Sequence, residues 1–329
     1  MTAPIVVSRS HLPGGGIARL AEHHRIKVWT DEAPPSTEQL AEFVGDAEVL
    51  VSVKSDHITS AFLTQCPALR LIALMSAGYD TIDTDAVVRH GITVSHAPGV
   101  LHEAAADLTM ALILNARRLV RPSLTMLHDG TWRTLELHEM LGLDVHGARL
   151  GIIGFGEIGN ALARRAHGFG MTVQHYDVRQ TDGGSASTLV PFDDLLRTSD
   201  IISVHVPLLP STHHFIGAAQ LAMMKPTATL VNASRGPVLD EAALIRALSE
   251  GRLHSAGLDV FEIEPINDLH HPLLQLPNVF ATPHIASATR GARAAMVDLA
   301  VNNVLSWLST GTAVTPIPEC RGSSRSAGV

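Results

Sequence analysis

Residues 148–159 read ARLGIIGFGEIG, an apolar strand pattern that ends in three glycines with the spacing G-x-G-x-x-G. A helical pattern, IGNALARRAHGFG, overlaps its end and continues the chain. In such a strand–turn–helix unit, Gly154 permits the tight turn, Gly156 lets the backbone approach a pyrophosphate, and Gly159 allows the helix to pack on the strand. Glycine patterns of this kind also occur in turns that bind no ligand. The residues that follow therefore decide whether this turn is predicted to bind a dinucleotide.

The helix after the glycines begins near Glu157 and Ile158, and the free N–H groups of a helix start favour an anion such as a pyrophosphate. The next strand pattern, TVQHYD, ends at Asp177, 21 residues after Gly156 (177 − 156). An acid about 20 residues after such a turn binds ribose hydroxyls. The sequence therefore predicts a site for NAD, and NADP is less favoured because a carboxylate repels its 2′-phosphate. Arg179 is interpreted as a solvent-exposed loop residue.

Apolar strand patterns alternate with helical patterns along the whole chain. Five strand patterns lie before residue 99, at residues 5–8, 26–29, 49–53, 71–76 and 92–96. Six more lie at residues 148–156, 172–177, 201–207, 228–234, 255–260 and 278–284. Alternation of this kind predicts right-handed crossovers and parallel sheets with helices on both faces. With 329 residues, two α/β domains are expected.

Composition excludes several classes of protein. The 46% of hydrophobic and 17% of charged residues are typical of a folded globular chain. A formal net charge of −8 disfavours nucleic acid as a partner. No leader peptide or bilayer-spanning run is recognised, so neither secretion nor membrane insertion is predicted. The two cysteines, Cys66 and Cys320, suit a reducing cytoplasm, and the Gly/Ser-rich tail RGSSRSAGV is interpreted as disordered.

Nineteen histidines raise the question of a metal. The doublets at residues 23–24, 213–214 and 270–271 adjoin in sequence and do not share a helix face. No metal is therefore expected.

Four polar side chains come directly after apolar strand patterns of the second series: Arg235 in VNASRGPVLDE, Asp259 and Glu264 in GLDVFEIEP, and His284 in TPHIASAT. Each by itself has an ordinary structural explanation. In an open α/β sheet, however, ligands bind outside the carboxyl ends of the strands. The four side chains are therefore expected to form one site.

These motifs resemble those of the NAD-binding D-isomer-specific 2-hydroxyacid dehydrogenases, and within that family they are most similar to the glyoxylate/hydroxypyruvate reductases. The similarity extends over nearly the whole chain, through SAGYDTID (76–83), APGVLHEAAADLT (97–109) and HVPLLPSTHHFIG (205–217). The chain departs from the family pattern at His102 where Thr is common, at Thr81 where Asn is common, and at Ala286 where Gly is common.

The resemblance implies an enzyme that transfers a hydride between nicotinamide and a small 2-keto or 2-hydroxy acid. Arg235 would bind the substrate carboxylate and keto oxygen, because its planar guanidinium donates two parallel hydrogen bonds. His284 would donate the proton in reduction and accept it in oxidation. Glu264 would orient the imidazole and favour its charged form.

The same resemblance implies the binding residues around this catalytic set. Backbone N–H groups near Ser76, Ala77 and Gly78 would hold the other face of the substrate carboxylate. Asp259 would face the nicotinamide carboxamide. Besides the glycine turn and Asp177, the implied cofactor contacts are Val206, Pro207, Thr212, Ala233, Asp259 and His284.

The fold expected on this basis is a Rossmann coenzyme domain of residues 100–287 inserted into a flavodoxin-like substrate domain of residues 1–99 and 288–329. The family also implies a homodimer, and the arm that holds Trp132 is either a subunit contact or an ordinary surface loop. Alternatives on the same scaffold are phosphoglycerate, formate and phosphite dehydrogenases. A dinucleotide-sensing corepressor that only binds the cofactor is the alternative from another class.

Overall fold

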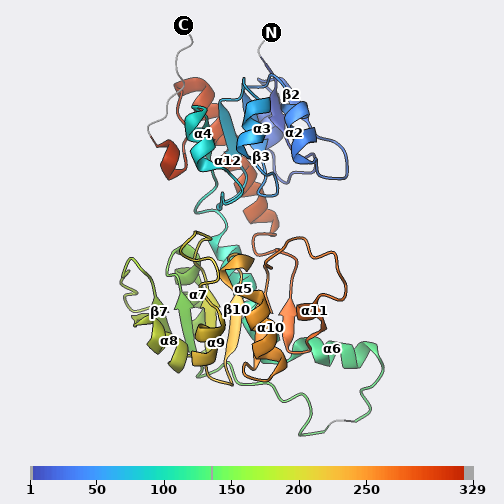
Figure 1. Cartoon of the computed structure of the whole chain (residues 1–329), viewed down its shortest axis with the longest axis vertical. Coiled ribbons are helices and arrows are strands. Elements are labelled where there is room, and N and C mark those ends of the chain that lie inside the picture. The colour runs from blue at the N-terminus through green and yellow to red at the C-terminus, as the bar shows by residue number, and fades with distance from the viewer. Residues whose placement is uncertain (1–2, 135, 322–329) are drawn as a thin grey trace. The chain divides into compact units, whose positions relative to one another are not determined.

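The chain folds into two compact units, as the computed structural model in Figure 1 shows. The structure describes residues 3–134 and 136–321. Unit 1 comprises Met1–Leu101 and Ser287–Val329, and unit 2 comprises His102–Ala286. The tail interpreted from composition as disordered lies, apart from its first residue, outside the described residues.

Unit 1 is built on a five-stranded parallel sheet in the order β2-β1-β3-β4-β5. Its strands are β1 (Ile5–Val7), β2 (Ile26–Val28), β3 (Val49–Ser52), β4 (Leu71–Leu74) and β5 (Thr93–Ser95). Its helices are α1 (Gly16–Ala21), α2 (Thr37–Val44), α3 (Ser60–Gln65), α4 (Thr84–Arg89) and α12 (Arg290–Thr310), with a 3-10 turn η2 (Pro318–Cys320).

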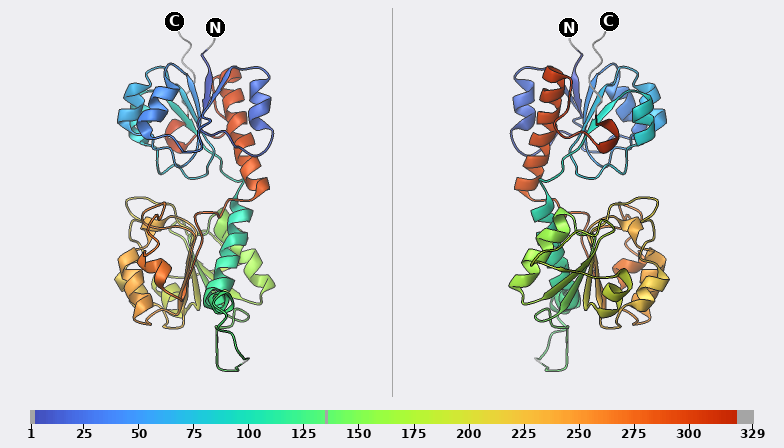
Figure 2. Two further views of the ribbon diagram at one scale, coloured as in Figure 1. Left: turned by 90° about the vertical axis from the view of Figure 1, so that its right-hand side faces the viewer. Right: turned by 90° about the vertical axis from the view of Figure 1, so that its left-hand side faces the viewer.

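Both faces of this sheet are covered by helices, as Figure 2 shows. Successive strand residues point to opposite faces: Val6 packs in one cluster with α2, α3 and α4, while Ile5 and Val7 pack in the other with α1 and α12. Helix α12 contacts α1, β3 and β4 and buries Trp307 there, so this late segment completes the core of the first sheet.

Unit 2 is built on a seven-stranded parallel sheet in the order β12-β11-β10-β9-β6-β7-β8. Its strands are β6 (Arg149–Ile153), β7 (Thr172–Tyr176), β8 (Thr188–Leu189), β9 (Ile201–Val204), β10 (Thr229–Asn232), β11 (Ser255–Leu258) and β12 (Val279–Ala281). Its helices are α5 (His102–Arg117), α6 (Val120–His128), α7 (Glu157–Gly168), α8 (Phe192–Thr198), α9 (Ala218–Met223), α10 (Glu241–Ser249) and α11 (Pro272–Gln275), with a 3-10 turn η1 (Gly236–Val238).

The second sheet also has two covered faces. Helices α5 and α7 pack with Ile152 on one face, and α8, α9 and α10 pack with Ile153 on the other. The sequence predicted six strands for this sheet and missed β8, because two residues, both exposed, leave no apolar run to recognise. The predicted class, two parallel α/β sheets with a Rossmann domain, is confirmed.

The strand order of unit 2 determines where a ligand can bind. Strand β6 lies between β7 and β9, so the chain runs outward from β6 in both directions and leaves a crevice at the carboxyl ends of β6 and β9. The part of the chain that the structure describes contains no helix long and apolar enough to cross a membrane.

Candidate active site

The three glycines between β6 and α7 are required for different reasons. Gly154 has a φ of +93°, and a Cβ there would lie 2.7 Å from the carbonyl oxygen of His205. A Cβ at Gly159 would lie 2.5 Å from the carbonyl oxygen of Gly154. A Cβ at Gly156 would meet only the guanidinium of Arg179, at 3.8 Å. The fold therefore requires Gly154 and Gly159, whereas Gly156 leaves space open for a ligand.

A cavity of about 380 Å³ opens beside this turn, lined by His102, Phe155, Gly156, Glu157, Asn160 and Arg164. Helix α7 begins at Glu157, and its N-cap residue Gly156 offers no side chain to its first N–H groups. The Nδ1 atom of His102 is buried and has no hydrogen-bond partner among the described residues. The free N–H groups at the start of α7 and the open space at Gly156 fit the pyrophosphate of a dinucleotide.

Alanine substitutions at Gly156 and Gly159 should separate binding from folding. Gly156→Ala is expected to leave the melting temperature within about 2 °C of the parent and to weaken NADH binding at least about tenfold, because its Cβ occupies only ligand space. Gly159→Ala is expected to destabilise the fold by about 1–3 kcal/mol, because its Cβ collides with backbone. Thermal denaturation measures the effect on stability, and NADH titration measures the effect on binding. Undiminished NADH binding by Gly156→Ala would refute a pyrophosphate site at this turn.

Asp177 lies just after β7, with its side chain almost completely buried. Its carboxylate accepts hydrogen bonds from the N–H of Phe155 at 2.8 Å, from the N–H of Arg179 at 2.8 Å, and from the Arg179 guanidinium at 3.2 Å on each oxygen. The Arg179 side chain is the main reason that the pKa of Asp177 falls to about 2, with the two N–H groups adding to it and burial opposing it. Arg179 is 69% exposed, as interpreted from sequence, but that interpretation missed the ion pair.

Arg235 follows β10 in a loop that is fixed from within. The side-chain amide of Asn232 donates to the carbonyl oxygen of Arg235 at 2.9 Å, and its oxygen accepts from the N–H of Ser234 at 3.0 Å. A Cβ at Gly236 would lie 1.8 Å from the carbonyl oxygen of Phe261. The absence of a side chain at Gly236 therefore lets the Arg235 loop touch the segment that leads to Glu264.

Glu264 and His284 form a hydrogen-bonded pair. A Glu264 oxygen lies 2.6 Å from Nδ1 of His284, and its other oxygen accepts from the N–H of Phe261 at 3.0 Å. About 30% of each side chain is exposed. Because Glu264 engages Nδ1, Nε2 is the nitrogen left to exchange a proton with a substrate. His284 has a φ of +52°, a left-handed backbone conformation that is uncommon for residues other than glycine.

Asp259 holds the loop that carries His284 through several hydrogen bonds. It is completely buried, and its carboxylate accepts from the hydroxyl of Thr282 at 2.6 Å and from the N–H groups of Ile285 and Ala286, both at 2.8 Å. Its carbonyl oxygen accepts from the N–H of His284 at 2.9 Å. The structure thus shows Asp259 holding the loop, and its contact with the nicotinamide carboxamide stays a prediction.

The remaining implied cofactor residues lie at the same carboxyl edge of the second sheet. Val206 and Pro207 follow β9, and Ala233 follows β10. Thr212 closes the loop after β9, where its hydroxyl donates to the carbonyl oxygen of Pro207 at 2.6 Å and accepts from the N–H of Leu209 at 2.8 Å.

His205 is a residue of this edge that sequence reasoning did not single out. Its imidazole bonds the Ser203 hydroxyl at 2.8 Å, and burial lowers its pKa to about 4, so the ring is neutral near pH 7. Its carbonyl oxygen is the atom that forbids a side chain at Gly154. The signal that could have identified His205 is its position directly after the apolar strand β9.

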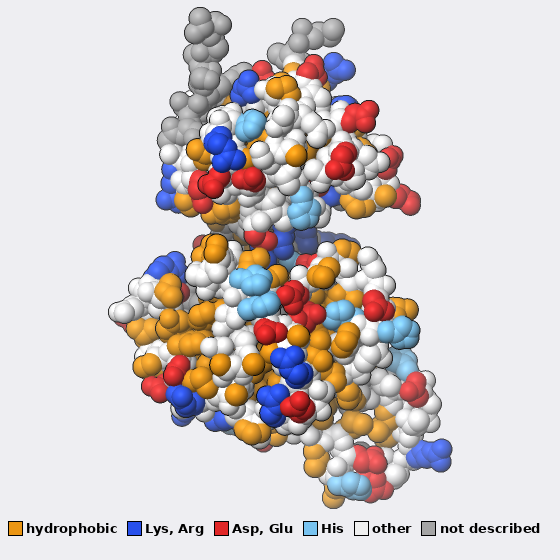
Figure 3. Space-filling model, viewed as in Figure 1, with side chains coloured by type: hydrophobic (Ala, Val, Ile, Leu, Met, Phe, Trp, Pro, Cys, Tyr) orange, Lys and Arg blue, Asp and Glu red, His pale blue; other side chains and the backbone are white. Residues whose placement is uncertain are grey.

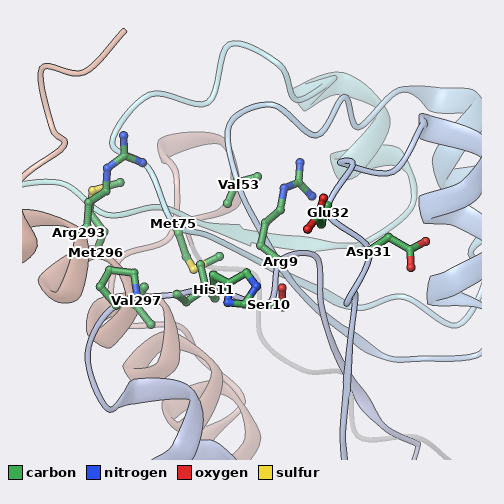
Figure 4. Close-up of a pocket in the computed structure, with 12 residues that line it drawn as sticks. Arg9, Ser10, His11, Asp31, Glu32, Val53, Met75, Arg293, Met296 and Val297 are labelled. Carbon is green, nitrogen blue, oxygen red and sulfur yellow. The ribbon is translucent and has the colours of Figure 1, made fainter. Parts of the chain in front are cut away.

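In unit 1, the predicted carboxylate-binding loop Ser76–Gly78 follows β4. The Ser76 hydroxyl donates to the carbonyl oxygen of Gly78 at 2.5 Å, and His96 bonds the carbonyl oxygen of Ala77 at 2.8 Å. A cavity of about 410 Å³ lies at this carboxyl edge, where loops after β1, β3 and β4 meet (Figure 4). Its lining includes Met75, the neighbour of Ser76, the cationic Arg9 and Arg293, and the acidic Asp31 and Glu32.

A G-x-G-x-x-G turn, a buried acid after the next strand and a hydrogen-bonded His–Glu pair lie on one Rossmann sheet, which is the arrangement expected of a nicotinamide-dependent dehydrogenase. The comparison with known families is more specific. The model of the D-isomer specific 2-hydroxyacid dehydrogenase NAD-binding domain matches residues 110–286. The chain belongs to this family, which confirms the resemblance read from its motifs.

Individual relatives agree over nearly full length. The chain is 43% identical to a glyoxylate reductase of Korarchaeum cryptofilum, over 92% of each protein. It is 41% identical to glyoxylate/hydroxypyruvate reductase B of Serratia proteamaculans, over 94% of this chain and 95% of the relative. An NADPH-dependent glyoxylate/hydroxypyruvate reductase of Sinorhizobium meliloti, solved with NADP and malonate, superimposes with a TM-score of 0.85 at 31% identity over 100% of both chains. The protein is therefore a 2-hydroxyacid dehydrogenase, and the phosphoglycerate, formate, phosphite and corepressor alternatives are not favoured.

Proposed function

We propose that this dehydrogenase reduces glyoxylate or hydroxypyruvate with NADH. The observation that carries the proposal is the 2.6 Å contact between Glu264 and His284, in a unit whose Arg235 loop touches the Glu264 segment. The relatives named as glyoxylate and hydroxypyruvate reductases supply the substrate class.

In the proposed reaction, a nicotinamide bound to unit 2 would supply the hydride that reduces the keto acid. Gly156 and the start of α7 would hold its pyrophosphate, and Asp177 would hold its ribose. Arg235 binds the substrate carboxylate together with the keto oxygen, where negative charge develops. His284, oriented by Glu264 through Nδ1, donates its Nε2 proton to that oxygen. Oxidation runs the same steps backward, with neutral His284 as the base.

The substrate test is a panel of 2-keto acids followed by NADH oxidation: glyoxylate, hydroxypyruvate, pyruvate, oxaloacetate and 2-ketobutyrate. The highest kcat/KM is expected for glyoxylate or hydroxypyruvate. A higher kcat/KM for pyruvate, oxaloacetate or 2-ketobutyrate would show that the protein is a 2-hydroxyacid dehydrogenase with a different preferred substrate. Absence of turnover with every acid, together with NADH binding, would instead support the corepressor-like alternative.

Asp177 supports a preference for NAD over NADP. Its low pKa keeps the carboxylate ionised throughout the pH range of any assay, so it repels a 2′-phosphate. Arg179 acts in the opposite direction, because its exposed guanidinium lies on the same carboxylate and an arginine at this edge can accommodate a 2′-phosphate.

Substitutions at these two residues should therefore shift cofactor choice in opposite directions. Asp177→Ala is expected to raise the KM for NADH about tenfold and to lower the ratio of kcat/KM with NADH to kcat/KM with NADPH. Arg179→Ala is expected to raise that ratio, because the Asp177 carboxylate then remains without a neighbouring positive charge. The measurement is kcat/KM for both cofactors with each variant. Equal use of both cofactors by the unmodified protein would contradict the preference for NAD.

We assign unit 1, residues 1–99 and 288–329 in the expected division, as the substrate domain. The support is the cavity beside Met75, because its lining loops follow β1 and β3, which flank the switch point of the 2-1-3-4-5 strand order. Ser76, Ala77 and Gly78 are proposed to bind the substrate carboxylate through their N–H groups.

We also propose a homodimer in the cytoplasm. Helix α6 buries none of its residues, and the arm that follows exposes Trp132, Leu137 and Leu141 by 57%, 92% and 66%. Large apolar side chains clustered on one arm mark an association surface. The buried free thiols of Cys66 and Cys320 suit a reducing compartment. Light scattering that gives the mass of one chain at micromolar concentration would contradict the dimer.

A further inference from the structure

A second cluster of metal-binding side chains lies in unit 2, outside the dehydrogenase site. We propose that His213, His214 and Glu262 form a binding site for a divalent transition-metal ion such as Zn²⁺. One ligand atom from each of the three residues lies within 4.8 Å of the others. Nε2 of His214 is 2.7 Å from a Glu262 oxygen, and the rings of His213 and His214 stack with their centroids 4.1 Å apart.

The backbone explains why two adjacent histidines meet on one side. Neighbouring side chains on a strand point to opposite faces, and on a helix they diverge by about 100°. His214 instead has a φ of +52°, so the chain turns there and the two rings stack, tilted by only 28°. The turn is held by the N–H of His214, which donates to the carbonyl oxygen of Pro237 at 2.8 Å, and by the N–H of His213, which donates to that of Leu209 at 3.0 Å.

From the sequence no metal is expected, because the members of an adjacent histidine pair do not share a helix face. That argument applies to regular helices. A left-handed residue inside the doublet removes that objection. The doublet at residues 213–214 is therefore a chelating pair.

The third ligand is also fixed in place, and its surroundings are acidic. The N–H of Glu262 donates to a Glu241 carboxylate oxygen at 3.1 Å, and the other oxygen of Glu241 lies 3.2 Å from Nε2 of His271. Figure 3 shows histidine and acidic side chains next to one another on this face of unit 2. Two neighbouring carboxylates favour a cation at this position.

The ligand types select the ion. Two imidazoles and one carboxylate suit Zn²⁺, Co²⁺, Ni²⁺ or Cu²⁺, whereas Mg²⁺ and Ca²⁺ prefer oxygen ligands. A tetrahedral Zn²⁺ with bonds of about 2.0–2.2 Å leaves its fourth position to water. The side chains of His214 and Glu262 are 37% and 34% exposed, so they can rotate by the small amount that such bonds require.

An ion at this position would link two active-site segments. The histidines belong to the loop after β9, and Glu262 belongs to the segment that carries Glu264. The site uses none of the proposed catalytic side chains Arg235, Glu264 and His284. Its expected effect is to stabilise the coenzyme unit by binding only the folded state.

The test uses the whole chain, freed of metal by a chelator and dialysed. Calorimetric titration with Zn²⁺ and visible spectroscopy with Co²⁺ are compared for the parent, for His213→Gln, and for His23→Gln as a matched control. His23 is an exposed member of another adjacent pair, in unit 1. The parent and the control are expected to bind one ion with micromolar affinity at this site and to show the d–d bands of four-coordinate Co²⁺.

His213→Gln is expected to lower the Zn²⁺ affinity of this site at least about tenfold and to abolish those bands. Without metal, its melting temperature should equal that of the parent, which shows that it folds. Added Zn²⁺ should raise the melting temperature of the parent and the control but not that of His213→Gln. Absence of saturable binding to the parent, or equal binding by His213→Gln, would overturn the site.

Discussion

Replacing Arg235 with lysine is expected to lower kcat/KM for glyoxylate by about 100-fold, although the positive charge is retained. An ammonium cannot reproduce the two parallel hydrogen bonds that a guanidinium donates to a carboxylate and a keto oxygen. Hydrogen bonds to charged groups contribute about 1.5–3 kcal/mol, and about 1.4 kcal/mol corresponds to a factor of ten. The measurement is initial-rate NADH oxidation at saturating NADH over a range of glyoxylate concentrations.

Arg252→Lys is the matched control, because Arg252 lies in the same unit and makes an exposed ion pair with Glu250 at 2.7 Å. Its kinetics should stay within about twofold of the parent, since exposed pairs contribute little. Near-normal kinetics in Arg235→Lys would show that the substrate carboxylate is bound by other residues.

Glu264→Gln is expected to lower kcat/KM for glyoxylate reduction by about 10- to 100-fold. The Glu264 carboxylate lies 2.6 Å from Nδ1 of His284, so the hydrogen bond that orients the ring is made to a charged group. Glutamine keeps the size of the side chain but removes that charge. The expected loss follows from about 1.5–3 kcal/mol for a hydrogen bond to a charged group and about 1.4 kcal/mol for each factor of ten in rate.

Initial rates of NADH oxidation over a range of glyoxylate concentrations, recorded for the parent, Glu264→Gln and Glu250→Gln, provide the test. Glu250 is an exposed acid of the same unit, so its substitution controls for the loss of one negative charge. If kcat/KM of Glu264→Gln stays within about twofold of the parent, Glu264 is not the partner of the proton donor.

The sequence by itself determined the glycine turn, the fold class and the candidate site residues. The glycines at 154, 156 and 159 are required by the local path of the backbone. Asp177 follows them at the distance in sequence that one βαβ unit imposes. A short stretch of sequence is therefore enough to predict this turn and its acid. Arg235, Glu264 and His284 could be proposed because each follows an apolar strand pattern, and parallel strands bring their carboxyl ends to one edge.

Only the tertiary structure decided how these residues act on one another. Gly236 allows the Arg235 loop to touch Phe261, 25 residues later (261 − 236), and nothing local to either segment marks that contact. The ion pair of Arg179 with Asp177, the bonds from the 282–286 loop to Asp259, and the stacked rings of His213 and His214 depend on side-chain directions and on left-handed backbone at non-glycine residues. Such features depend on the three-dimensional path of the backbone, which residue patterns along the chain do not encode.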